Sequence, residues 1–373
     1  MLSYNNVNNS GKGRNNMRKH YLDNIRWTTV LTVVVYHVLY MYNAEGIAGG
    51  LGKITDLKVQ YYDLFMNIVY PWLMPVLFIV SGISSRLYLE KHTDREFIKS
   101  RTQKLLVPST IGLLAFQFIQ GYISMSLSSA MDQIKDVPYP VKHLIMSLSG
   151  SGVLWYAQML WLFCVMLTLI RKLEKDRCWM LCAKAGLPVL ILLTPIVLLS
   201  AQIGNTPVVV VYRFGLYSAM FHLGYFLFSH DEVMDKLKRN YLLLAAAAVA
   251  LCAAFCAYSF GKNYADEPIY RSWLFTSYSW FGCLAILGGY ARYFDFETGL
   301  TGWMNRHSFG MYVFHYLGIS AVALFIARPG LLGPLPIYIL SLIAGLAAGY
   351  ILYEIISRIP FLRWAVLGIK KKG

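Results

Sequence analysis

An arginine and a histidine stand in the first long apolar run of the chain. Arg26 and His37 are eleven residues apart, about 20 degrees past three full helical turns, so both project from one helix face, about 16 Å apart along the axis. Ionisable side chains inside membrane helices are costly and usually functional. Histidine suits proton transfer near neutral pH, and arginine suits binding of anions. We therefore predict a chemical role for both, the alternative being a paired contact between helices.

The composition predicts the elements that must hold these residues. Of the 373 residues 57% are apolar and 14% are charged, against about 25% charged in soluble domains. A spanning helix needs about 20 apolar residues, so we expect an all-α integral membrane protein with a bundle of about ten transmembrane helices. The predicted runs are 22–42, 62–88, 104–127, 153–170, 180–202, 208–229, 241–260, 272–293, 308–327 and 333–357.

Positive charge is distributed by side of the membrane. The net charge is +15, and 24 of the 34 Lys and Arg residues lie in or beside the two terminal segments and the even-numbered connections. Because basic residues accumulate in the cytoplasm, both termini are predicted to be cytoplasmic in a multi-pass protein of the cell membrane. The charge then reflects topology and anionic membrane lipids as partners, and no nucleic acid is expected.

Three regions follow from this pattern. Residues 1–20 form a polar cytoplasmic tail without the apolar stretch of a signal peptide, 21–357 form the transmembrane domain, and 358–373 form a basic cytoplasmic tail. The six Cys residues lie in or beside runs without His or Asp at ligand spacing, so no metal site is expected.

Other polar residues inside the runs fall at two levels when 1.5 Å is allowed per residue. The level about 10 Å from the cytoplasmic side holds Ser81, His222 and His315. The level nearer the outside, where His37 is placed, also holds Arg213 and the pair Trp155–Tyr156. We expect a polar passage open toward both faces, and simple interhelical contacts are again the alternative.

Four motifs in order resemble the acyltransferase 3 family, membrane enzymes that O-acylate carbohydrates. The first is Tyr21-Leu22-Asp23-Asn24-Ile25-Arg26-Trp27 followed by Tyr36-His37, and the second is Phe78-Ile79-Val80-Ser81-Gly82. The others are Arg101-x-x-Lys104 before Pro108, and Ser308-Phe309-Gly310-Met311-Tyr312-x-x-His315. The likeness covers residues 21 to about 357. Lys104 replaces the commoner Arg, and the extracytoplasmic esterase-like domain of longer members is missing.

The resemblance implies a cytoplasmic acyl-CoA donor, with acetyl-CoA expected, and a carbohydrate or glycolipid acceptor reached from the other side. Arg101, Lys104, Arg26 and Arg86 are then the expected cofactor-binding residues, because CoA carries three phosphate groups. Ordinary positive-inside charge is the alternative for Arg86, and we prefer it. Trp155, Tyr156, Tyr122 and Arg213 are the expected substrate-binding residues.

For acyl transfer, a hydroxyl must lose its proton as it attacks the thioester. His37 is the predicted general base and Arg26 a donor anchor or stabiliser of negative charge. Ser81 is a candidate polar donor or acyl acceptor, although a Ser-Gly pair that permits close helix packing is the preferred interpretation. His315 is a candidate second base.

Two other functions remain open from the sequence. Layered polar residues and a second helix broken at Pro71 and Pro75 are also typical of a transporter, although no internal repeat is visible. N-acetylation of an amino sugar is the nearer alternative. Acceptor, acyl length, oligomeric state and the choice between direct transfer and an acyl-enzyme are not determined by the sequence.

Overall fold

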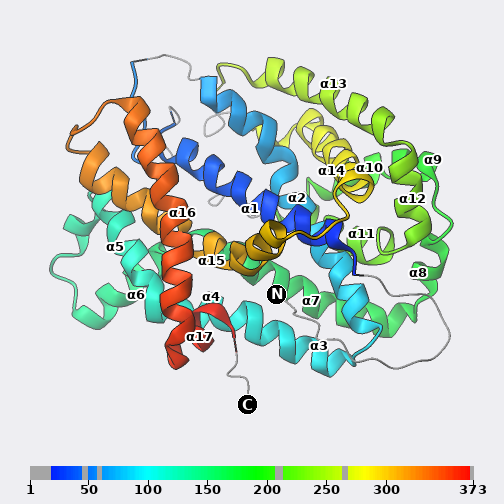
Figure 1. Ribbon diagram of the computed structural model, residues 1–373, viewed down its shortest axis with the longest axis horizontal. Helices are drawn as coiled ribbons and strands as arrows, with labels where there is room; N and C mark the ends of the chain where they lie inside the picture. Colours follow the sequence, from blue (N-terminus) through cyan, green and yellow to red (C-terminus); the bar gives the residue numbers. More distant parts are fainter. Residues whose placement is uncertain (1–17, 44–48, 57–60, 206–212, 263–267, 370–373) are drawn as a thin grey trace.

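A computed structural model describes residues 18–43, 49–56, 61–205, 213–262 and 268–369, and these are helical with no β-strand among them (Figure 1). The first half comprises α1 (His20–Met41), α2 (Tyr61–Leu89), α3 (Asp94–Arg101), η1 (Thr102–Leu106), α4 (Val107–Gly112), η2 (Leu113–Gln117), α5 (Phe118–Leu127), η3 (Ala130–Ile134), α6 (Tyr139–Ser149), η4 (Gly152–Leu154) and α7 (Trp155–Glu174). The second half comprises α8 (Arg177–Cys182), α9 (Leu187–Leu192), α10 (Thr194–Ser200), α11 (Phe214–Phe226), α12 (Asp231–Arg239), α13 (Tyr241–Ser259), η5 (Ile269–Arg271), α14 (Trp273–Tyr293), α15 (Gly299–Val322), η6 (Ala323–Ala327), α16 (Pro334–Arg358) and α17 (Pro360–Leu367).

Six helical segments in the described part of the chain are long and apolar enough to cross a membrane. They are 64–89, 94–127, 152–174, 241–259, 299–327 and 334–358. Helices α1 and α14 have 22 and 21 residues, so they also have the length of a span, but they carry more polar residues. The all-helical membrane fold is thus confirmed, and the number of ten crossings and the cytoplasmic termini stay predictions.

The predicted run 180–202 is not one helix. It is divided into α8, α9 and α10, because Pro188 and Pro195 each occupy the first turn of a new helix and lack the N–H that would continue the previous one. Helix α2, in contrast, is continuous through Pro71 and Pro75. The unwound helix of the transporter alternative is therefore not found there.

A helical hairpin that the sequence did not predict precedes α7. Residues 139–149, expected to be a connection, form α6, which packs along α5. A Cβ at Gly121 would overlap the carbonyl of Met146, and one at Gly150 would overlap that of Gln117, so only glycine allows this close approach. Helices α5 and α6 therefore form an antiparallel hairpin that precedes α7.

Helices α1 and α15 run side by side in the same direction through the centre of the molecule (Figure 1). Near their starts, the side chain of Asn24 donates to the carbonyls of Phe294 and Phe296, at 2.7 and 2.9 Å. Helix α16 packs antiparallel against α15, where Gly318 lies against Ala344 and Gly310 against the Tyr353 ring. Helix α1, near the beginning of the chain, thus packs together with α15 and α16, near its end.

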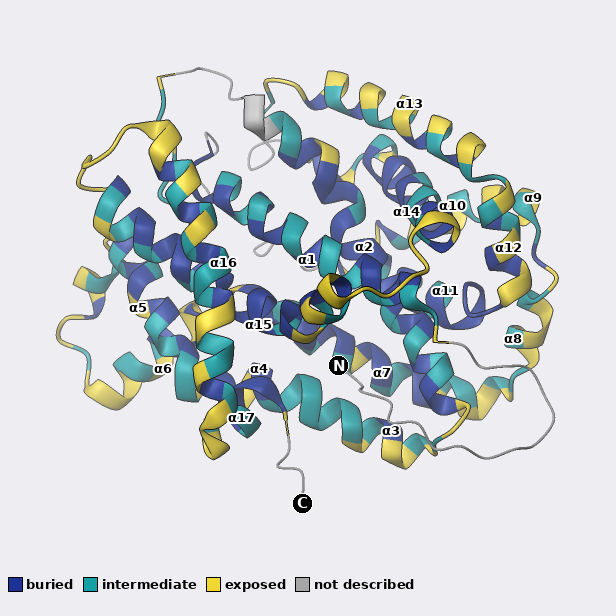
Figure 2. Cartoon of the chain, in the orientation of Figure 1, coloured by how far each residue is buried: buried dark blue, intermediate teal, exposed yellow. Residues whose placement is uncertain are grey.

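Helix α2 is packed most tightly against α11. Gly82 faces the carbonyl of Phe221, and Gly224 faces that of Ile79, each without room for a Cβ. Buried side chains follow α2 along most of its length, whereas α13 lies at the edge of the molecule with an exposed outer face (Figure 2). Gly82 therefore has the packing role expected of the Ser-Gly pair.

The region predicted as a basic C-terminal tail contains a packed helix. Residues 360–367 form α17, in which Ala365, Val366 and Leu367 are buried. Gly112 of α4 lies against the Ala365 backbone. The end of the chain therefore supports the segment that carries Arg101 and Lys104.

We expect Gly82→Ala and Gly224→Ala each to destabilise the protein by about 1–3 kcal/mol, since the added methyl group overlaps a backbone carbonyl that cannot move without separating two helices. Thermal unfolding in detergent measures this loss. Gly299→Ala is the matched control, because a Cβ there meets nothing within 4 Å. Equal stability of all three variants would contradict the close packing of α2 against α11.

Candidate functional site

A pair of histidines joins α1 to α15 inside the bundle. His37 Nδ1 lies 2.8 Å from His315 Nε2, and the two rings stack with centroids 5.0 Å apart. This corrects the predicted levels, which placed His315 about 12 Å closer to the cytoplasm than His37. Helix α15 begins at Gly299 rather than at 308, so His315 is 16 residues into its helix and His37 is 17 residues into α1, about 24–26 Å in both cases.

The hydrogen bonds of the pair fix which nitrogen carries each hydrogen in the neutral rings. His315 Nδ1 lies 2.8 Å from the carbonyl oxygen of Met311, and a carbonyl only accepts, so Nδ1 carries the hydrogen and Nε2 accepts. His37 Nδ1 must then be the donor to His315. The lone pair of His37 Nε2 is left available, which is what a general base requires.

Aromatic side chains surround His37. The rings of Tyr36, Tyr40 and Tyr316 lie 5.4, 6.0 and 5.2 Å from it. His315 has no exposed surface, whereas His37 keeps a partly exposed side chain. Of the two residues, His37 is therefore the more accessible.

Arg26 lies on the same helix, three turns before His37. Its guanidinium donates to Asp23 at 2.6 Å and to the hydroxyl of Ser84 on α2. About a third of the Arg26 side chain remains exposed. Arg26 is therefore held by α1 and α2 together while part of it stays accessible.

Ser81 and Tyr156 meet next to Arg26. The Ser81 Oγ lies 2.9 Å from the Tyr156 hydroxyl, which donates to the Leu77 carbonyl at 3.2 Å. Since the phenol has one hydrogen, Ser81 is the donor to the Tyr156 oxygen. The predicted outer position of Trp155 and Tyr156 is therefore wrong: after the α5–α6 hairpin, α7 begins at the level of Ser81. The Trp155 ring packs 5.6 Å from that of Tyr217.

The predicted donor-binding residues differ in how they are engaged. Arg26 and Arg101 both act electrostatically on Tyr156, and Lys104 lies close enough to Arg101 to interact with it, so Arg26 and Arg101 share one phenol as a neighbour. Arg86 instead pairs with Asp176 at 2.7 Å and lies 3.8 Å from the Trp179 ring. Its interactions join α2 to α8, in line with a structural role.

Three other predicted positions lie away from the histidine pair. The Tyr122 side chain on α5 is 50% exposed, and His222 bonds to the Ser218 carbonyl of its own helix. Arg213 is buried at the start of α11, 4.4 Å from the Phe275 ring and 5.7 Å from that of Tyr70. Tyr70 stacks on Tyr36 at 5.7 Å, so Arg213 is two aromatic rings from His37.

A family model described as an acyltransferase domain matches residues 19–354. This chain belongs to the acyltransferase 3 family. Neither the curated proteins nor the solved structures that were compared with the chain gave a match. Family membership and the membrane-spanning helices together make this protein a membrane acyltransferase.

Sequence reasoning missed several residues at the centre of the acyltransferase. Tyr312 donates to the Val153 carbonyl, which ties α15 to the start of α7, and its ring lies 5.9 Å from Tyr156. The Tyr-x-x-His spacing was visible, but only the histidine was given a role. Tyr36 and Tyr40 lie one turn apart around His37, a signal hidden by the many tyrosines of this chain.

A second histidine contact at the other end of α15 was also missed. His307 Nε2 lies 3.2 Å from Glu354 on α16, and its Nδ1 bonds to the Trp303 carbonyl. Two turns before His315, this contact fixes α15 against α16. No three His, Cys, Asp or Glu side chains gather as metal ligands in the part of the acyltransferase that the structure describes.

We expect His315→Leu to reduce acyl transfer by about 10–100-fold, because the leucine fills the space but no longer accepts from His37 Nδ1. His315→Gln offers an amide oxygen as acceptor and is expected to recover part of the rate. Turnover by protein with unchanged thermal stability measures both. A positioning role is refuted if the two variants are equally impaired, since only the acceptor distinguishes them.

Proposed function

We propose that this acyltransferase moves an acyl group, with acetyl expected, from cytoplasmic acyl-CoA to a hydroxyl of a cell-surface carbohydrate or glycolipid. The observation that carries the proposal is the hydrogen-bonded pair of His37 and His315. It leaves one imidazole nitrogen free beside a partly exposed ring.

His37 Nε2 takes the proton of the acceptor hydroxyl as its oxygen attacks the thioester carbonyl carbon. The new C–O bond forms, the C–S bond breaks, and the imidazolium returns the proton to the departing CoA thiolate. His315 accepts from His37 Nδ1 throughout and holds the ring in the tautomer that exposes Nε2. It acts as a positioning residue rather than as the second base considered from the sequence.

The donor is bound on the basic side of the site. Arg26, Arg101 and Lys104 supply positive charge for the phosphates of CoA. The pantetheine arm extends from there toward the histidines, which accounts for the separation between Arg26 and His37 along α1. Arg86 is left out of this binding site because Asp176 and Glu90 already pair with it.

Direct transfer fits the surroundings of Ser81 better than an acyl-enzyme. An activated serine needs an adjacent base, but Ser81 donates to a phenol oxygen, and no contact joins it to His37 or His315 in the described residues. The hydroxyls of Ser81 and Tyr156 instead lie beside the basic residues of the donor side. They are placed to orient the thioester rather than to carry the acyl group.

The acceptor approaches His37 through its aromatic surroundings. Of the three tyrosines around it, Tyr40 is partly exposed, and an aromatic ring suits a sugar. Trp155 is packed against Tyr217, and Tyr122 has no contact with the histidine pair, so both are less suited than Tyr40. An amino sugar would fit the same surroundings, and trial acceptors with and without a free amine distinguish N-acetylation from O-acetylation.

His37→Gln is expected to abolish acyl transfer, with a loss of at least about 10²–10⁴-fold, because glutamine keeps a donor toward His315 but has no basic nitrogen. The measurement is acetyl-CoA consumption and acceptor acylation by the purified variant. Its thermal stability serves as the control for folding. Turnover near that of the wild type would refute the general-base role.

Arg101→Gln is expected to raise the KM for acyl-CoA about tenfold and to leave the KM for the acceptor unchanged, since a charge-assisted contact to a phosphate is lost. Arg95→Gln is the matched control, because Arg95 is an exposed basic residue of the same helix. Initial rates at varied donor and acceptor concentrations separate the two constants. Equal donor dependence of both variants would argue against the phosphate role.

A further inference from the structure

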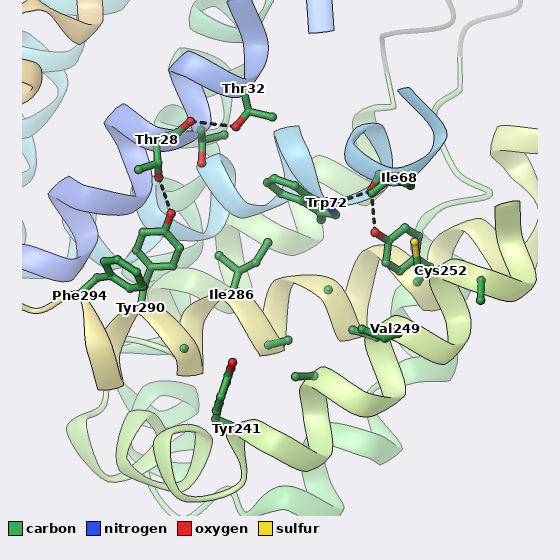
Figure 3. A pocket seen from close by; sticks show the side chains of 18 of the residues that line it. Thr28, Thr32, Ile68, Trp72, Tyr241, Val249, Cys252, Ile286, Tyr290 and Phe294 are labelled. Atoms are coloured by element: carbon green, nitrogen blue, oxygen red, sulfur yellow. Dashed lines mark hydrogen bonds between the residues drawn. The ribbon is translucent and has the colours of Figure 1, made fainter. Parts of the chain in front are cut away.

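A cavity of about 690 Å³ lies between the peripheral helix α13 and helices α1, α2 and α14 (Figure 3). None of its lining residues carries a charge. Small side chains face it from α13, among them Ala245 and Ala248, and Gly282 and Gly289 do so from α14. The cavity has the size of a ligand pocket, and its walls belong to helices that cross or border the membrane.

Several polar side chains in its walls already donate to neighbouring groups. Tyr290 donates to Thr28 Oγ1 at 2.8 Å, and Tyr278 donates to the Ile68 carbonyl at 2.6 Å (Figure 3). Thr32 and Trp72 donate to carbonyls one turn earlier in their own helices. These four groups therefore have no hydrogen left to donate to an occupant, and the hydroxyl groups of Thr29, Tyr241 and Tyr293 also belong to the lining.

The mostly apolar, uncharged lining decides what can fill the cavity. A sugar or nucleotide needs many polar partners, and the few hydroxyl groups in these walls do not supply them. A hydrocarbon chain loses nothing there and gains contact with every wall. The volume also far exceeds the gaps found in well-packed protein interiors, so an apolar chain is the occupant that fits.

One end of the cavity is bordered by positive charge. The rings of Tyr241 and Tyr293 meet there with centroids 5.5 Å apart. The Arg292 guanidinium lies 5.3 Å from the Tyr293 ring and donates to the carbonyl of Lys238. Arg239 precedes Tyr241 by two residues and is exposed.

The two arginines are free to bind an anion. Lys238 is paired with Asp235 at 3.1 Å, whereas Arg239 and Arg292 have no carboxylate partner in the part of the chain that the structure describes. Positive charge beside the mouth of an apolar cavity matches a ligand with a hydrocarbon tail and an anionic head.

We propose that this cavity holds one acyl chain of an anionic membrane phospholipid, with its phosphate at Arg239 and Arg292. The lipid fills the space between α13 and the bundle, where protein contact is limited to one side of α13. It thereby attaches the peripheral helix to α1, the helix that carries Arg26 and His37. The proposal does not depend on the function proposed above.

The first test blocks the cavity. Ala245→Phe places a ring in it, whereas the matched variant Ala246→Phe adds the same ring to an exposed position of the same helix. Protein in detergent is incubated with phosphatidylglycerol, and bound lipid is counted by native mass spectrometry. We expect at least about fivefold less bound lipid for Ala245→Phe than for Ala246→Phe. Equal binding by the two variants would overturn the proposal.

The second test reads the head group without changing the core. Arg239→Gln and Arg292→Gln are each expected to weaken phosphatidylglycerol binding about fivefold and to weaken binding of phosphatidylcholine of the same chain length less, because the choline cation offsets the charge of its phosphate. Arg95→Gln serves as the control for loss of one exposed charge. If the wild type bound both lipids equally, the assignment of an anionic head group would be wrong. Displacement of phosphatidylglycerol by equimolar polyprenyl phosphate would identify an isoprenoid instead of a phospholipid.

Discussion

The hydrogen bond between His37 and His315 is the contact on which the site depends. It joins the first helix of the described chain to a helix near its end, and it lies where water is scarce and hydrogen bonds are strong. A buried donor or acceptor without a hydrogen-bond partner would lower the stability of the fold there. The Met311 carbonyl, two rings and two helices thus act as one unit that leaves a single nitrogen, His37 Nε2, without an assigned partner.

Close helix packing is what makes this contact possible. Gly345 of α16 lies against the His315 carbonyl and against Val34 of α1, so three helix backbones approach one another beside the pair. Gly310 and Gly318 admit α16 along the rest of α15. In a bilayer, where helix association relies on van der Waals packing rather than on exclusion of water, small residues at such crossings give position as well as stability.

The polar residues lie in two zones, one basic and one built from histidines and tyrosines. Arg26 and Arg101 are neighbours of the Tyr156 phenol, with Lys104 beside Arg101, and the histidine pair lies at a later position of α1 among tyrosines. Tyr312 connects the zones, because its ring faces Tyr156 and its helix carries His315 one turn later. This separation suits a reaction in which a charged donor and a neutral acceptor meet without either crossing the other's site.

The sequence by itself determined much of this protein. Apolar runs marked most of the helices, helical periodicity placed Arg26 and His37 on one face of α1, and four short motifs identified the family. These features depend on residues within one or two helical turns of each other, and the 3.6-residue period of the helix determines how such residues are arranged. Pro188 and Pro195 were equally local signals, yet the run that they interrupt was apolar enough to be taken for one helix.

Only the tertiary structure decided which polar residues meet. The predicted levels placed His37 apart from His315 and Tyr156 apart from Ser81, and both pairs are in contact. The error arose because a level depends on where a helix begins. The start of α15 is held by Asn24, which donates to the carbonyls of Phe294 and Phe296, and the start of α7 is held by Tyr312, which donates to the Val153 carbonyl. Such contacts join residues more than a hundred positions apart, and no periodicity along the chain encodes them.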